Sequence, residues 1–378
     1  MRKISFGDLK IGNTARKYVQ AALDRNWISE GQNVKEFEQK FAAKFGYKHA
    51  IATSSGTDAD ICSCASLYDF GAQRGDEILV PALCFVACAN SILAAGFIPK
   101  FVDIELETLN IDPAKIEAAI TKKTRAIMVV YTMGKPCEMD AIMKIAKAHH
   151  LMVIEDACES HGATYKGKVI GSIGDMGTFS LYAAHIIVAG EGGMVVTNSD
   201  EVDKVVRSVK SHGRPFGSIY FDFQRIGFNS RMNELTAAIG LEGLENFDET
   251  FKKRKQNLYK LLELTQGLSD YLYFIQEEGH EKVTAHAFPL VLKDKKYDRD
   301  KLYAYLEEKG IQCKNLFGSL PTQHQAFKFL NYKLGQFPVS EYVGDNGLHF
   351  GIHQYLNDDD LVYISEALKS YFREYTPG

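Results

Sequence analysis

Residues 49–60 read HAIATSSGTDAD, an apolar run followed at once by a polar turn. The run favours a β-strand, and the turn is typical of a capped helix start, so we expect a helix from Thr57 onward. A strand that leads directly into a helix is the repeating unit of parallel α/β sheets. This stretch therefore predicts an α/β fold, provided that the unit repeats along the chain.

The unit does repeat over the following hundred residues. A helical pattern occupies 87–96, and further strand patterns occur at 77–83 (EILVPAL), 99–104 (PKFVDI), 125–132 (RAIMVVYT) and 151–157 (LMVIEDA). Such alternation predicts a mostly parallel sheet with helices on both faces. TFSLY (178–182) and GMVVTN (193–198) then lie close together, which predicts a hairpin or a reversal of direction at a sheet edge.

The chain has 378 residues, enough for two domains or for one large α/β domain with an appendage. A helical block from Met232 to about Leu264 is followed by a mixed segment, with helices expected at 298–310 and 358–372. We place the large domain at 1–247 and a smaller C-terminal α/β domain at 248–378. Residues 1–15 are candidates to pack with the smaller domain.

The overall charge offers no general attraction to polyanions. There are 44 Lys and Arg against 48 Asp and Glu, a formal net charge of -4. This balance argues against nucleic acid and anionic membranes as partners. The start of the chain lacks an apolar signal region, and no stretch approaches the roughly 18 apolar residues of a membrane span, so we expect a cytoplasmic protein.

The cysteine spacing argues against disulfides and metal sites. The seven cysteines are Cys62, Cys64, Cys84, Cys88, Cys137, Cys158 and Cys313. An odd number without an export signal indicates reduced thiols, and no pair of CxxC motifs predicts zinc. We therefore expect no metal ligand set.

Two stretches place polar groups where α/β sheets bind ligands. LMVIEDACESHG (151–162) brings Asp156 to the carboxyl end of a strand, where a carboxylate can keep a heterocyclic nitrogen protonated; a helix cap is the equally weighted alternative. Gly56 and Thr57 begin a helix whose N–H groups can bind phosphate, although a plain capped turn is the commoner meaning of such a stretch. Phe85 opens a helix at the same edge and can stack on a planar ring, unless it belongs to the core.

These stretches occur in an order that resembles a known family. GTDAD (56–60), the region 84–104, GKPCEMDAI (134–142), IEDACESHG (154–162), GEGGMVVTN (190–198) and IGFNSRMNE (226–234) together resemble the DegT/DnrJ/EryC1/StrS sugar aminotransferases. The resemblance implies the fold-type I, aspartate aminotransferase-like architecture. It also implies pyridoxal or pyridoxamine phosphate (PLP or PMP) as cofactor, and a homodimer with active sites shared between subunits.

The resemblance assigns expected roles to single positions. Gly56, Thr57 and Ser180 are expected to bind the cofactor phosphate, and Asn229 is expected to reach the phosphate bound in the neighbouring subunit. Phe85 is expected to stack on the pyridine ring, and Asp156 to contact the pyridine nitrogen. Glu159 is expected to make a polar contact near the ring and the substrate. A carboxylate at Asp156 keeps the ring cationic and hence an electron sink.

His185 stands where the family has the lysine that binds the cofactor covalently, and no lysine occurs between Lys168 and Lys204. Histidine cannot make that bond but can act as a base near neutral pH. The same replacement marks a subgroup resembling GDP-4-keto-6-deoxymannose 3-dehydratase, which the C-terminal SEYVGDNGLHFGIHQYLN also resembles. The resemblance implies dehydration of a nucleotide-linked 4-keto-6-deoxy sugar with glutamate as amino donor, in deoxysugar biosynthesis. A related branch holds an iron–sulfur cluster on four cysteines, and the cysteine-free interval 159–312 excludes that ligand set.

Other interpretations remain open at this stage. His185 can be a core histidine, and His161, His212 and Arg231 can line the pocket, bind phosphate or lie at a dimer interface. The chain can also be a relative that binds a cofactor or nucleotide sugar without catalysis, or an aminotransferase with an altered base. The nucleotide and the sugar are not set by the sequence.

Overall fold

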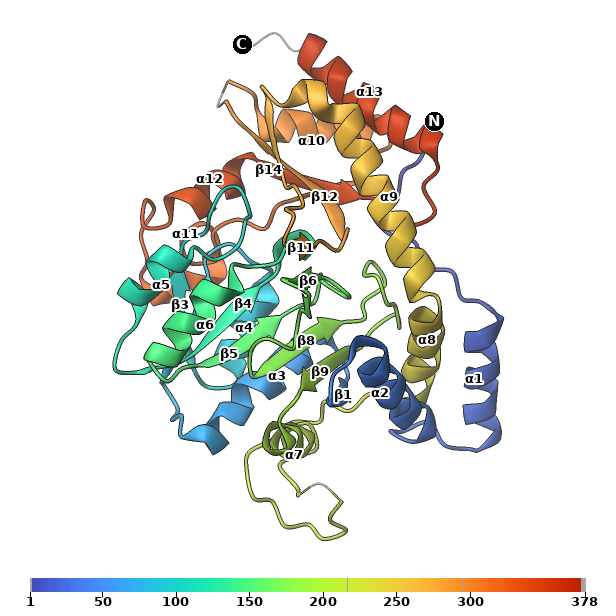
Figure 1. Cartoon of the computed structure of the whole chain (residues 1–378), viewed down its shortest axis with the longest axis vertical. Helices are drawn as coiled ribbons and strands as arrows, with labels where there is room; N and C mark the ends of the chain where they lie inside the picture. The colour runs from blue at the N-terminus through green and yellow to red at the C-terminus, as the bar shows by residue number, and fades with distance from the viewer. Residues whose placement is uncertain (1, 216, 295, 375–378) are drawn as a thin grey trace.

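A large, mostly parallel sheet forms the centre of the computed structural model, which describes residues 2–215, 217–294 and 296–374 (Figure 1). Its seven strands lie in the order β1 (His49–Thr53), β9 (Gly193–Thr197), β8 (Met176–Ser180), β5 (Met152–Asp156), β4 (Thr124–Val130), β2 (Glu77–Pro81) and β3 (Ile98–Val102). Only β9 runs against its neighbours, pairing antiparallel with both β8 and β1. The expected mostly parallel sheet is confirmed.

Helices cover both faces of this sheet (Figure 1). In chain order they are α1 (Asn13–Asp24), α2 (Gln32–Phe45), α3 (Gly56–Ser66), α4 (Val86–Ala94), α5 (Pro113–Ala119), α6 (Met139–Ala148), α7 (Asp200–Val209), α8 (Glu234–Glu245) and α9 (Phe247–Thr265). Short 3-10 turns lie at Leu67–Phe70, Thr132–Gly134, Gln266–Leu268 and Gln325–Leu330. Within the described ranges, no helix combines the length and the apolar character needed to cross a membrane.

The strands are apolar on both sides because both sides are buried. In β2, Leu79 packs into the hydrophobic cluster that contains α2 and α6, whereas Ile78 and Val80 pack into the cluster that contains α3, α4 and α7. Successive side chains of a strand point to opposite faces, so this alternation assigns each helix group to its face. The continuous apolar runs in the sequence thus reflect a sheet between two helical layers.

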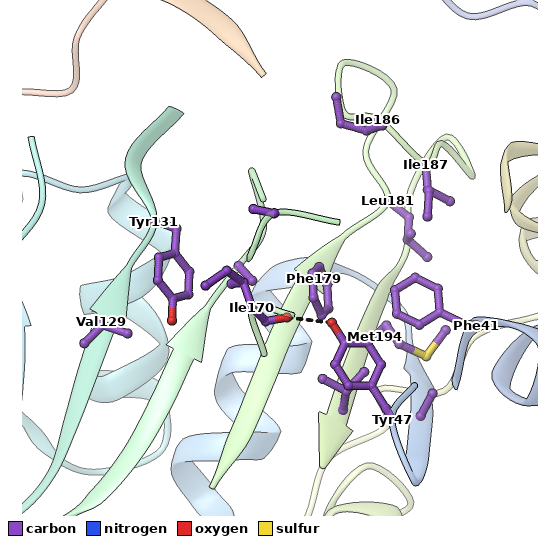
Figure 2. Packing of buried hydrophobic residues seen from close by; sticks show 14 of the residues in the cluster. Phe41, Tyr47, Val129, Tyr131, Ile170, Phe179, Leu181, Ile186, Ile187 and Met194 are labelled. Carbon is purple, nitrogen blue, oxygen red and sulfur yellow. Dashed lines mark hydrogen bonds between the residues drawn. The ribbon is translucent and has the colours of Figure 1, made fainter. Parts of the chain in front are cut away.

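The first of these clusters extends to the end of the sheet where β8 stops. Phe41 and Tyr47 pack against Phe179 there, and the Tyr47 hydroxyl donates a hydrogen bond of 2.6 Å to the Ile170 carbonyl (Figure 2). A buried hydroxyl needs such a partner. The contact ties the segment after β5 to the start of β1.

The C-terminal part has its own sheet and apolar cluster. The sheet has the order β10 (Leu272–Phe274), β12 (Ala287–Leu292), β14 (Gly347–Gly351) and β13 (Cys313–Asn315), and its helices are α10 (Arg299–Glu308), α11 (Leu320–Gln323), α12 (Pro338–Asn346) and α13 (Asp358–Glu374). A small third sheet joins β11 (Glu281–Lys282), β6 (Thr164–Tyr165) and β7 (Lys168–Val169). Helix α9 runs from α8 to α13 beside both parts (Figure 1). The division into domains 1–247 and 248–378 stays a prediction.

The N-terminal residues lie against the C-terminal part. Ile4 is 2% exposed, belongs to the same apolar cluster as β12 and β14, and forms an isolated bridge with Ile311. Phe6 continues in this direction, since its backbone N–H donates to the Gln312 side chain. Residues 4–6 thus lie against the C-terminal sheet before the chain enters α1.

Strands β8 and β9 show the expected reversal, but their connection is longer than a tight turn. Residues 181–192 link the two strands, and His185 lies in the middle of this link. Ile186 and Ile187 are buried in the core and hold the link against the sheet (Figure 2). The reversal therefore presents His185 at the carboxyl ends of the parallel strands.

Candidate active site

One cavity of about 470 Å³ lies at the carboxyl ends of β5 and β8. Seven of the residues singled out in the sequence line it, namely Gly56, Thr57, Phe85, Asp156, Glu159, Ser180 and His185. They come from segments up to about 130 positions apart. This is the edge of an open α/β sheet at which ligands bind.

The start of α3 forms one end of the cavity. Ser55 caps the helix by accepting a hydrogen bond from the Asp58 N–H, so α3 begins at Gly56, one residue before the predicted start at Thr57. The N–H groups of Gly56 and Thr57 have no partner within the helix, because they lie in its first turn. A Cβ atom on Gly56 would lie 2.7 Å from the Cβ of Ser180, so glycine permits the close approach of the helix to β8. The result is a corner that suits an anion, with a hydroxyl beside the N–H groups of the first helical turn.

Asp156 is the last residue of β5 and is 5% exposed. One carboxylate oxygen accepts from the Cys158 N–H at 3.1 Å, and the other accepts from the Cys88 thiol at 3.0 Å. These bonds fix its orientation at the cavity. Its role toward a ring nitrogen stays a prediction.

Phe85 is the residue before α4, and its side chain is 57% exposed at the cavity. Its ring centre lies 6.1 Å from that of Phe317, at an angle of 62°. Large aromatic rings are usually buried, so an exposed ring at a cavity is well placed to stack on a planar ligand. The alternative of a core phenylalanine does not describe this residue.

His185 reaches the cavity from the link between β8 and β9. Its N–H bonds to the Tyr182 carbonyl at 2.9 Å, and its own carbonyl accepts from Arg254 at 3.1 Å. The buried Nδ1 atom has no hydrogen-bond partner among the described residues. Burial, and then the positive charges of Arg254 and Lys314, lower the pKa of His185 to about 3. The imidazole is therefore neutral at physiological pH.

Glu159 and His286 meet beside His185. One Glu159 oxygen accepts from the Met133 N–H at 2.6 Å, and the other lies 3.5 Å from His286 Nε2. Met133 has a positive φ of 55°, a costly conformation that aims this N–H at the carboxyl group. Burial is the main cause that raises the pKa of Glu159 to about 8, and burial likewise lowers the pKa of His286 well below its usual value. The two side chains are thus mainly neutral at pH 7.

A second group of residues that line the cavity was not predicted from the sequence. It consists of Phe6, His286, Lys314, Phe317 and His349, mostly from the C-terminal sheet and its surroundings. The only sequence signal was a polar residue within or beside an apolar strand pattern, as in HAFPLVL (286–292). Such a signal does not say which cavity the residue faces, because the sheet must first pack against the N-terminal part.

The remaining candidates lie outside this cavity. Asn229 is exposed and pairs through its backbone with Ser211, while Arg231 donates to the Ser211 hydroxyl at 3.0 Å. His212 is exposed, and His161 is fully buried behind His185, with ring centres 6.4 Å apart. His161 has neither ring nitrogen hydrogen-bonded within the described chain. The position of Asn229 is compatible with a contact to another subunit, which stays a prediction.

This sheet order, with a helix start, an exposed aromatic ring and a buried carboxylate around one cavity, is that of the PLP-dependent aminotransferase fold. The chain belongs to the DegT/DnrJ/EryC1/StrS aminotransferase family, which matches residues 9–369. The resemblance seen in the sequence is therefore confirmed.

Individual relatives divide between two activities. The chain is 35% identical to the GDP-perosamine synthase of Caulobacter vibrioides, over 97% of both chains. It is 34% identical to the GDP-4-keto-6-deoxy-D-mannose 3-dehydratase of Yersinia pseudotuberculosis, over 94% of this chain and 93% of that one. Among solved structures, a mutant GDP-4-keto-6-deoxymannose-3-dehydratase with bound GDP-perosamine superposes with a TM-score of 0.89 at 31% identity, covering 97% of this chain and all of the other.

The cavity residues fit the cofactor of this family. The corner at Gly56, Thr57 and Ser180 suits a phosphate, Phe85 offers an unstacked ring, and Asp156 offers a buried acceptor. A solved relative, the Escherichia coli GDP-4-keto-6-deoxy-D-mannose-3-dehydratase, contains hydrated PLP and superposes with a TM-score of 0.88 at 30% identity, over 97% of this chain and all of that one.

Proposed function

We propose that this chain is a PLP/PMP-dependent 3-dehydratase of a nucleotide-linked 4-keto-6-deoxy sugar. The observation that supports it is His185, a neutral imidazole at the cavity where transaminating relatives need a lysine. An imidazole can take a proton but cannot bind the cofactor covalently. This combination favours removal of a hydroxyl group over lasting transfer of an amino group.

His185 is the proposed base. Its neutral form is the one that accepts a proton, and its pKa of about 3 shows that burial strongly disfavours the charged form in the cofactor-free cavity. A phosphate bound at Gly56 and Thr57 brings negative charge and raises the proton affinity of the imidazole. Its main-chain contacts to Tyr182 and Arg254 hold the backbone of His185 in place.

Glu159 is the proposed second proton-carrying group. A neutral carboxyl group can donate a proton to a leaving hydroxyl, and with a pKa of about 8 Glu159 is mostly neutral at pH 7. The Met133 N–H fixes one of its oxygens and leaves the other toward His286. Base and acid thus lie on the same side of the cavity.

The cofactor would be held by Gly56, Thr57, Ser180, Phe85 and Asp156. When bound, it supplies an amine for the ketone and an electron sink that allows the 3-hydroxyl to leave. The protein contributes orientation and charge. No iron–sulfur cluster is proposed, because residues 159–312 include no cysteine.

Lys314 is the residue proposed to bind an anionic group of a substrate. Its ammonium group lies 4.0 Å from the centre of the Phe6 ring, and the residue lines the cavity. A cation at this place suits the carboxylate of glutamate, the proposed amino donor, or the diphosphate of the sugar nucleotide.

A homodimer with shared sites is also part of the proposal. Ile219, Phe221 and Ile226 are each more than 80% exposed, in a segment that projects below α7 (Figure 1). Exposed apolar clusters of this kind mark interaction surfaces. Asn229 follows this segment directly, so a neighbour that covers the segment would also meet Asn229.

The test is product analysis with a panel of GDP-, dTDP-, UDP- and CDP-linked 4-keto-6-deoxy sugars, each incubated with PLP and glutamate. We expect one of them to give a 3-deoxy-4-keto sugar with release of ammonia. An amino sugar without ammonia would overturn the proposal. Binding without any product would indicate a non-catalytic relative.

A second candidate function is transamination. It is favoured by the GDP-perosamine synthases among the relatives and by Lys314, a lysine at the cavity from a different part of the chain. If Lys314 carries the cofactor, the amino sugar is the expected product in the same assay.

A further inference from the structure

Asp60 brings a second buried carboxyl group to the cavity beside Asp156. It lies on α3, is 1% exposed, and accepts a hydrogen bond of 2.6 Å from the Thr178 hydroxyl on β8. Single ligand atoms of Asp60, Asp156 and Cys158 all lie within 4.8 Å of one another. The proposed function uses Asp156 but gives Asp60 no task.

The surroundings do not neutralise two negative charges. In the part of the chain that the structure describes, the hydrogen-bond partners of the two carboxyl groups are the Thr178 hydroxyl, the Cys88 thiol and the Cys158 N–H. None of them is a cation. Two carboxylates at this separation and burial do not ionise together at neutral pH, because one raises the pKa of the other.

The two carboxyl groups differ in how well the charged form is stabilised. Asp156 accepts two hydrogen bonds and reaches the strand end, whereas Asp60 accepts one and lies deeper. The pKa of Asp60 is raised well above its usual value, first by burial and then by the charge of Asp156, and it is lowered only by the bond from Thr178. The nearby thiols of Cys64, Cys88 and Cys158 also have raised pKa values, mainly through burial or a neighbouring thiol, so they stay neutral.

We propose that Asp60 is a positioning residue that keeps its proton and thereby leaves a single negative charge on Asp156, facing the ring nitrogen of the cofactor. A protonated Asp60 acts as a neutral dipole beside Asp156. An ionised Asp60 would place a second charge behind it and hold the ring-nitrogen proton more tightly. The residue thus sets the charge with which Asp156 acts, and the inference holds for dehydration and transamination alike.

The test compares Asp60→Asn with wild type in the cofactor-free protein. Asparagine resembles a protonated aspartate in shape and charge. A group whose pKa is raised on folding loses stability as the pH rises, because the folded state must keep a proton that the unfolded chain releases. We expect the melting temperature of Asp60→Asn to exceed that of wild type by several degrees at pH 8, and by much less at pH 5.

Asp24→Asn, a change at an exposed carboxylate on α1, is the matched control, and its difference from wild type should not grow with pH. A constant or falling difference for Asp60→Asn would overturn the proposal. If the variant does not fold, infrared spectra of Thr178→Val decide the question, because the Thr178 hydroxyl donates its hydrogen bond to Asp60. A neutral carboxyl band at pH 8 that shifts in frequency relative to wild type supports a protonated Asp60, and a spectrum without such a shift contradicts it.

A second readout uses bound PLP. The absorbance of the wild-type complex should change at alkaline pH as Asp60 ionises, and the Asp60→Asn complex should lack this change. An alkaline transition that survives unchanged in Asp60→Asn would contradict the proposal. Neither readout involves a sugar substrate, so a failure here is separate from a failure of the proposed dehydratase activity.

Discussion

The imidazoles of His185 and His286 lie 4.8 Å apart, centre to centre, and are inclined by 35°. The guanidinium of Arg254, which is 2% exposed, donates to the main-chain carbonyls of both residues at 3.1 Å. One buried side chain therefore fixes the spacing of two histidines that come from the link after β8 and from the segment before β12. Its charge also helps to keep both rings neutral, after the larger effect of burial.

If His185 is the base, His185→Asn should retain the cofactor and lose dehydration by about 100-fold or more, because the amide has no titrating nitrogen. Turnover of the active sugar nucleotide, together with the absorbance of bound cofactor, checks this. His150→Asn is the control, since His150 is exposed and has a positive φ of 53° that asparagine tolerates. Turnover of His185→Asn at the parental rate would assign His185 to packing.

The covalent state of the cofactor separates the two candidate functions. Borohydride should fix no PLP to the wild-type chain, because imidazole forms no reducible bond with an aldehyde, whereas His185→Lys should become labelled at position 185. Peptide mass spectrometry locates the label. Lys314→Met is the matched variant. If Lys314 of the wild-type chain is labelled with PLP and the label is lost in Lys314→Met, the result would favour transamination.

Glu159 should make the protein less stable at alkaline pH. Its pKa is near 4.3 in an unfolded chain and about 8 in the folded protein, so the stability that its proton provides is complete below pH 4.3 and lost as the pH rises through 8. Glu159→Gln removes this loss, and we expect it to raise the free energy of unfolding by up to about 5 kcal/mol at pH 8.5 and by little near pH 4.5.

Urea unfolding of the cofactor-free protein at the two pH values measures the effect of Glu159→Gln. Glutamine keeps an acceptor for the Met133 N–H, so the local structure is preserved. An equal change at both pH values would show that Glu159 is ionised in the folded protein.

Shared active sites can be tested by complementation. Asn229→Asp and His185→Asn chains, each inactive alone, should regain about a quarter of wild-type activity when mixed as equal amounts of exchanging subunits, because half of the dimers then hold one intact site of two. Activity after refolding the mixture, with heterodimers identified by differential tags, is the measurement. Absence of recovery despite such heterodimers would place Asn229 outside the site.

The sequence predicted the cavity residues that follow the repeating strand and helix units. Asp156 and Gly56 lie at strand ends or helix starts, and the periodic pattern locates such positions directly. The role of Lys314 and His286 could not be predicted in this way, because it depends on how the C-terminal sheet packs against the large one. Asp60 was missed for another reason: a carboxylate in the first turns of a helix is expected to face solvent, and only the packing of α3 on β8 and its other neighbours buries it.

The cavity combines a floor from the large sheet with a wall from the C-terminal sheet and the N-terminal segment that contains Phe6. The groups proposed to hold the cofactor belong to the floor, whereas Phe6, Lys314 and Phe317 belong to the wall. Substitutions in the wall can therefore change which sugar nucleotide is accepted, while the residues proposed to hold the cofactor stay unchanged. Such a division gives one scaffold a simple evolutionary route to many substrates.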